Sequence, residues 1–220
     1  MARTKTIETC AMCGCNASTK DHIPPQSLYP KPRQPNLQLH TVPACKACNN
    51  GAARDDEEFK MIVGVSTGGA QSNQEAVVTS LQATMAANGR LDRVIRSGKQ
   101  MLTLDRGIFV PGPVAVSFEG PSYARVVERM IRGLYWREKM RPLGLAVPIQ
   151  VIDPSRLTTD KVTLFRDLLP NLEPKFLNGG TFCYKVGFAG DGTSVWALQM
   201  FGKHTVFGIA SPPEDCSTNP

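Results

Sequence analysis

Two Cys-x-x-Cys pairs constrain this chain more than any other feature of its sequence. The first pair is Cys10 and Cys13, and the second is Cys45 and Cys48. A two-residue gap lets both thiolates of a pair reach one ion, and two pairs supply the four sulfur ligands of a tetrahedral zinc site. The intervening stretch, residues 14–44, is longer than the roughly 15–20 residues of an ordinary zinc ribbon. We therefore expect the loop closed by zinc to carry further structure of its own.

The composition favours a protein of a reducing compartment with a polyanionic partner. Four of the seven cysteines lie in the two pairs, a pattern typical of metal binding rather than of a disulfide framework. The formal net charge of +6 favours a partner such as nucleic acid. No apolar run is long enough to cross a bilayer, and the N-terminus lacks the apolar segment of a signal peptide. We therefore expect a cytoplasmic protein with no membrane partner.

Prolines and a helical pattern divide the N-terminal region. Six prolines within residues 24–43 exclude a helix there and predict a stiff loop, which ends in a short strand at Thr41–Val42. A helix is expected from Cys45 through Ile62, with acidic residues near its positive end. We therefore predict an N-terminal module over residues 1–62 and a second region over residues 63–220.

The second region mixes helices and strands. Helical spacing and capping signals predict helices, and alternating apolar residues predict strands. The predicted helices are 73–88, 90–102, 123–139 and 161–169, and the predicted strands are 109–118, 145–152, 182–189, 195–201 and 205–210. The last three strands fit an antiparallel meander with turns at Asp191-Gly192 and Gly202-Lys203. The predicted fold class is α+β, a small zinc-stapled module followed by an α+β region with an antiparallel sheet.

The first cysteine pair, Asp21-His22, and the second pair followed by Asn49 together resemble the HNH endonuclease family in its zinc-stapled form. The resemblance covers roughly residues 8–60. It implies a two-stranded ribbon and a helix around one catalytic metal ion (the ββα-metal fold), followed here by a C-terminal α+β extension. It also implies that His22 is the general base and that Asp21 and Asn49 bind the metal ion. Imidazole suits a base near neutral pH, and oxygen ligands suit Mg²⁺ or Mn²⁺.

Two positions depart from the family pattern. The middle residue of the motif, usually Asn, orients the ribbon and holds the catalytic histidine. It is commonly found five positions before the second cysteine pair, where this chain has His40, and the nearest asparagine is Asn36. Both residues stay open for this role. Family members often carry a lysine three positions after the second metal ligand, where this chain has Ala52, although Arg54 could supply positive charge nearby.

Arginines recur along one face of the predicted helix 123–139. Arg125, Arg129 and Arg132, at spacings of four and three, could follow a phosphate backbone. The alternative is a solvated face with an ion pair between Glu128 and Arg132. Because the family lysine is missing, we expect phosphate contacts from this helix.

The sequence therefore predicts a metal-dependent endonuclease that cuts DNA, which we expect to be double-stranded. Structural zinc and catalytic Mg²⁺ or Mn²⁺ are the expected cofactors. One alternative is a non-catalytic zinc module that binds nucleic acid or protein, in which Asn49 caps a helix and His22 is structural. Another is a ribonuclease, and a homo-oligomer or a protein partner stays open. Members of the family act in restriction, phage biology, homing and antiviral defence.

Overall fold

The computed structural model describes residues 8–29, 31, 33, 35–67, 79, 83, 99–100, 115–116, 121–152 and 157–212. The strands and helices within these residues confirm the α+β class. In chain order they are β1 (Thr19–His22), η1 (Gln26–Leu28), β2 (Thr41–Ala44), α1 (Lys46–Asn50), α2 (Ala53–Thr67), β3 (Lys99–Gln100), β4 (Ala115–Val116), α5 (Pro121–Lys139), β5 (Ile149–Ile152), α6 (Thr159–Leu168), η3 (Leu169–Asn171), β6 (Lys175–Leu177), η4 (Asn178–Gly180), β7 (Phe182–Phe188), β8 (Ser194–Met200) and β9 (His204–Ala210).

The N-terminal part is a two-stranded antiparallel ribbon followed by helices. Strand β1 pairs with β2 in a register that places His22 opposite Thr41. The single helix predicted from Cys45 is wrong at its centre, because the chain leaves the helix at Gly51 and resumes it as α2. Glycine is the poorest helix former after proline, which accounts for the break at this position.

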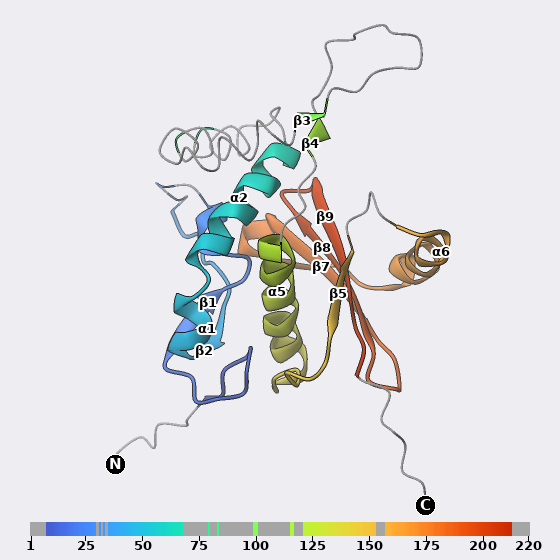
Figure 1. Ribbon diagram of the computed structural model, residues 1–220, viewed down its shortest axis with the longest axis horizontal. Coiled ribbons are helices and arrows are strands. Elements are labelled where there is room, and N and C mark those ends of the chain that lie inside the picture. Colours follow the sequence, from blue (N-terminus) through green and yellow to red (C-terminus); the bar gives the residue numbers. More distant parts are fainter. Residues whose placement is uncertain are drawn as a thin grey trace, which may run out of the picture.

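Helix α5 is the central element of the molecule. Figure 1 shows it between the sheet on one side and the ribbon with α1 and α2 on the other. Its apolar residues recur at helical spacing and are buried, as predicted; they include Val126, Val127, Met130, Ile131 and Leu134. The helix therefore supports both halves of the fold.

Two glycines let α5 approach its neighbours closely. A Cβ on Gly133 of α5 would lie 1.8 Å from Cδ1 of Ile23, the residue that directly follows β1. A Cβ on Gly208 of β9 would lie 2.3 Å from Ile131 Cδ1 of α5. On the ribbon side of α5, the backbone of Gly133 therefore packs against the Ile23 side chain. On the sheet side, the Ile131 side chain of α5 packs against the backbone of Gly208.

The large sheet has five antiparallel strands in the order β5-β9-β8-β7-β6. The predicted meander is confirmed as β7, β8 and β9, and its turns use the left-handed glycines Gly192 (φ 86°) and Gly202 (φ 69°). The predicted strand 145–152 begins only at Ile149. Arg132 explains the delay, because its guanidinium donates to three main-chain oxygens in the preceding segment, those of Leu143, Gly144 and Val147.

One continuous core joins the predicted regions 1–62 and 63–220. Cys10, Ile23 and Phe59 belong to the same buried cluster as Leu134 of α5 and Trp196 of β8. The N-terminal module therefore buries its apolar face against the C-terminal region, which also has a small second cluster of its own around Phe165.

The remaining predictions have mixed outcomes. The predicted helix 73–88 lies almost wholly outside the described residues. Lys99–Gln100 is a strand that pairs with β4, so the helix predicted over 90–102 is wrong at that point. In α6, Phe165 is buried as predicted, whereas the side chain of Leu164 is exposed. No helix among the described residues is long and apolar enough to cross a membrane.

Candidate functional site

The four paired cysteines come together at one point. The Sγ atoms of Cys10, Cys13, Cys45 and Cys48 all lie within 4.8 Å of one another, and Cys13 Sγ is 3.7 Å from Cys45 Sγ. Four sulfurs at about 2.3 Å from one zinc ion are about 3.8 Å apart, so the cluster has the size of a tetrahedral thiolate site. The four cysteines can therefore hold a metal ion.

Main-chain hydrogen bonds fix the first cysteine pair against the ribbon. Cys10 N–H donates to Cys15 O, and Ala11 N–H donates to Pro43 O of β2 at 2.9 Å. At the second pair, Cys45 Sγ accepts from Cys48 N–H, and this main-chain hydrogen bond is the largest of several that lower the pKa of Cys45 to about 7. A lowered pKa favours the thiolate, which is the form that binds metal.

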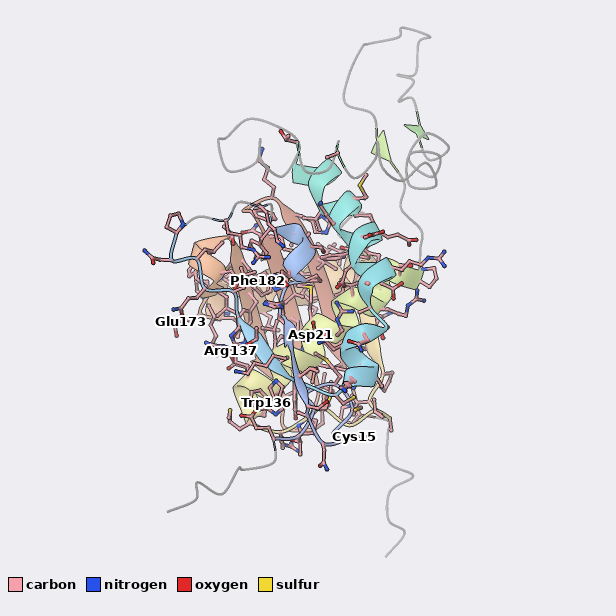
Figure 2. All side chains as sticks on the ribbon, turned by 90° about the vertical axis from the view of Figure 1, so that its left-hand side faces the viewer. Cys15, Asp21, Trp136, Arg137, Glu173 and Phe182 are labelled. Carbon is pink, nitrogen blue, oxygen red and sulfur yellow. The ribbon has the colours of Figure 1, made fainter. Side chains whose placement is uncertain are left out.

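Asp21 points from β1 into the interior. Figure 2 shows it near the centre of the molecule, next to α2 and α5, and its residue is only 6% exposed. One carboxylate oxygen, Oδ1, accepts the main-chain N–H of His22 at 2.8 Å. The other, Oδ2, lies 3.1 Å from Arg129 Nε, yet it is buried and accepts no hydrogen bond among the described residues. Burial raises the pKa of Asp21, and the charge of Arg129 opposes that shift.

The surroundings of Asp21 carry excess negative charge. Arg129 also pairs with Asp56 of α2, and Arg125 makes a bidentate contact with Asp55 at 2.7 and 2.8 Å. Three carboxylates therefore face two guanidinium groups. Among the described residues, however, only the four cysteines form a group of three or more His, Cys, Asp or Glu side chains close enough to share a metal ion.

Asn49 reaches back from α1 to the strand that carries Asp21. Its Nδ2 donates to Thr19 Oγ1 at 3.2 Å and to Lys20 O at 3.3 Å. No hydrogen bond from a described residue reaches its amide oxygen. The amide nitrogen thus anchors the side chain on β1, and the oxygen remains available as a ligand.

His22 follows Asp21 directly, so its side chain leaves the opposite face of β1. The residue is half-buried. Burial lowers the pKa of His22, and the nearby charge of Arg33 lowers it further. The neutral imidazole is therefore the form favoured near neutral pH. Sequence reasoning missed Arg33, because nothing in the proline-rich loop indicates that it folds back toward His22.

Neither candidate for the middle residue holds the ribbon with its side chain. Asn36 is exposed, in a left-handed conformation with φ 71°. The ring of His40 faces Arg137 of α5, with Nδ1 3.3 Å from the guanidinium. Burial and the charge of Arg137 lower the pKa of His40 to about 4. The main-chain N–H of His40 donates instead to Asn178, a second residue that sequence reasoning missed.

The arginines of α5 do not form the free row that their spacing predicts. Arg129 is nearly buried between Asp21 and Asp56, and Arg132 binds main-chain oxygens. Arg125 is half-exposed but is held by Asp55. Arg129 and Arg132 are therefore occupied by contacts inside the molecule, whereas phosphate binding by the exposed Arg125 stays a prediction. Arg54 has a side chain 74% exposed and lies 3.8 Å from a carboxylate oxygen of Glu58, and its contact with phosphate likewise stays a prediction.

Comparisons with protein-family models, with curated proteins and with solved structures find no match for this chain.

Proposed function

We propose that the protein is a metal-dependent endonuclease of the HNH type that hydrolyses DNA phosphodiester bonds. One observation carries the proposal. Asn49, which directly follows the second cysteine pair, is hydrogen-bonded to β1, the strand that ends in Asp21 and His22. A staple of four cysteines alone requires none of these three side chains.

Zinc is the ion that the four thiolates suit, and its role in this proposal is structural. It joins the N-terminal loop to α1, and so it fixes Asn49 relative to β1. Asp21 Oδ2 and the amide oxygen of Asn49 are the ligands that would hold Mg²⁺ or Mn²⁺. When bound, this cation supplies a Lewis acid that polarises the phosphate and stabilises the leaving oxygen.

His22 supplies the base in this proposal. Its imidazole is largely neutral near pH 7, because both burial and Arg33 lower its pKa. It can therefore accept a proton from a water molecule that attacks phosphorus. Asp21 fixes the main chain at this point by accepting the His22 N–H. In this proposal Arg33, whose charge acts on His22, contributes positive charge near the phosphate of a bound strand.

Cleavage of supercoiled plasmid DNA tests the proposal. The wild-type protein should cut with Mg²⁺ or Mn²⁺ and stop with EDTA. His22→Ala should lower kcat about 10²–10⁴-fold, as loss of a general base does, with zinc content unchanged. Asn49→Ala should lose activity that higher Mn²⁺ partly restores.

Asn50→Ala is the matched control for Asn49→Ala, because Asn50 is the exposed neighbour in the same helix. It should cut at the wild-type rate. If the zinc-loaded wild type binds DNA without cutting it under any of these cations, the protein is a non-catalytic zinc module. Cleavage of RNA but not of DNA would make it a ribonuclease.

A further inference from the structure

Asn178 lies far from β1 in sequence and touches it in space. It occupies the tight turn η4 between β6 and β7 and is only 4% exposed. The turn is unusual, because Asn178, Gly179 and Gly180 all have left-handed backbones, with φ of 53°, 67° and 82°. Successive left-handed residues are costly without glycine, so this backbone is closely specified by its sequence.

The side-chain amide of Asn178 joins three segments of the N-terminal module. Its Oδ1 accepts the main-chain N–H of His40 at 2.6 Å, and its Nδ2 donates to the main-chain oxygen of Ile23 at 3.2 Å. The same Nδ2 donates to Tyr29 Oη at 2.8 Å. A buried amide with both ends satisfied holds its partners in one arrangement.

Ile23 and His40 are the next pair beyond the end of the ribbon. The last paired residues of β1 and β2 are His22 and Thr41, and Ile23 N–H still donates to His40 O at 3.0 Å. Asn178 bonds the remaining oxygen of Ile23 and the remaining N–H of His40. Its amide therefore continues the ladder by one step, directly after His22.

The turn that carries Asn178 is itself fixed against the connection between β1 and β2. A Cβ on Gly179 would lie 3.1 Å from Leu37 Cδ1, so the backbone of the turn packs closely against the Leu37 side chain. Thr181 Oγ1 donates to the main-chain oxygen of Asn178 at 2.7 Å. The hydrogen bonds of the Asn178 amide to Ile23, Tyr29 and His40 are therefore supported by Thr181, the residue directly before β7, and by the packing of Gly179 against Leu37.

We propose that Asn178 is a positioning residue for His22, acting through the main chain of Ile23 and His40. This inference rests on the proposed function. Asn178 binds the oxygen of the Ile23–Pro24 peptide and the N–H of His40, and the oxygen of His40 in turn accepts the N–H of the peptide that follows His22. The amide therefore holds the end of the ribbon one residue beyond His22, and through it the direction in which the imidazole leaves the strand. A displacement of about 1 Å at a catalytic group can cost about 10²-fold in rate.

Asn178→Gly tests the role, because glycine keeps the left-handed backbone and removes only the amide. We expect kcat for plasmid cleavage to fall about 10–100-fold, with KM for DNA and zinc content near wild type. Hydrogen exchange should quicken about tenfold at the amide of His40 and stay unchanged in β7 and β8. Met140→Gly is the matched control, since Met140 is also a left-handed residue (φ 53°) but is exposed and lies outside the site, and it should leave both readouts unchanged.

Asn178→Asp is the second variant, and it decides the question if the glycine variant does not fold. It keeps an acceptor for His40 and places an oxygen against the carbonyl of Ile23, so kcat should fall while the amide of His40 stays protected. Wild-type kcat in a folded variant with faster exchange at His40 would make Asn178 structural only and overturn the inference. A wild-type protein that does not cut DNA would overturn the proposed function instead.

Discussion

Gly133 decides how closely α5 approaches the ribbon, and a side chain at this single position should therefore change the stability of the protein. Alanine is the better helix former by about 1 kcal/mol in an exposed helix. Here its Cβ would lie 1.8 Å from Ile23 Cδ1 and 3.3 Å from Val42 Cγ2, both on fully buried side chains. Overpacking of this kind costs about 1–3 kcal/mol. Gly133→Ala should therefore destabilise the protein, as measured by urea unfolding.

Ala124→Gly is the control for this prediction, because it makes the reverse exchange at a site on the same helix that is not fully buried. It should cost about 1 kcal/mol by helix propensity alone. A Gly133→Ala variant more stable than wild type would show that Ile23 has room to move.

Sequence alone predicted the cluster of four cysteines that the structure brings together. The four cysteines are predictable because the two-residue gap is itself a geometric requirement of the metal. Asp21 and Asn49 stay predictions as metal ligands, and the sequence singles each of them out by its place next to another motif residue. Arg129 and Asn178 were misread or missed because their partners lie 73 to 155 residues away. Spacing along one helix cannot reveal that a guanidinium is already taken by a carboxylate of another element.

At the scale of elements, the junction of α2 and α5 contrasts a buried ion pair with an exposed one. Arg129, with a side chain 12% exposed, is held between Asp21 and Asp56, whereas the side chain of Arg125 is 54% exposed. Removing one partner of a buried pair typically costs about 3–5 kcal/mol, and an exposed pair contributes about 0–1 kcal/mol. Arg129→Met should therefore be far more destabilising than its matched control Arg125→Met in chemical unfolding at pH 7.

The stability lost in Arg129→Met should also depend on pH. Burial raises the pKa of Asp56, and Arg129 opposes the shift, so the pKa rises further without the guanidinium. The folded variant then holds the Asp56 proton more tightly than its unfolded chain does, and stability from this group falls as pH rises through the raised pKa. The loss in free energy of unfolding of Arg129→Met, relative to wild type, should therefore be smaller at about pH 5 than at pH 7. A deficit that is constant over this range would mean that Asp56 does not titrate with the loss of its partner.

Secondary structure was likewise predictable where its cause is local in the sequence, and was not predictable where its cause is a distant residue. The helix 123–139 and the meander of β7, β8 and β9 were predictable, because their apolar periodicity and turn glycines are local. The break between α1 and α2 depends on one glycine inside a helical pattern, and pattern alone does not decide whether a helix survives it. The late start of β5 depends on Arg132, which takes main-chain oxygens of the segment before it.

At the scale of the whole molecule, the shared core predicts that residues 1–62 do not fold alone. In the full chain Ile23 and Phe59 are fully buried, and α5 and the sheet belong to the cluster that covers them. The isolated fragment should bind zinc through its four cysteines but show little amide protection in β1 and β2. Hydrogen exchange measured on the zinc-loaded fragment and on the full chain checks this. Equal protection in both would show that the zinc module is autonomous.

The position of β9 has a consequence for the order of events during synthesis. This last strand lies between β5 and β8 inside the sheet, and Ile131 of α5 packs against it at Gly208. On the ribosome, α5 can pack against α2 and β2, which precede it in the chain, before β9 has left the exit tunnel, and it gains the completed sheet only afterwards. The ribbon can therefore form before the sheet, and the hydrogen bonds from Asn178 to Ile23 and His40 are added once η4 has been made.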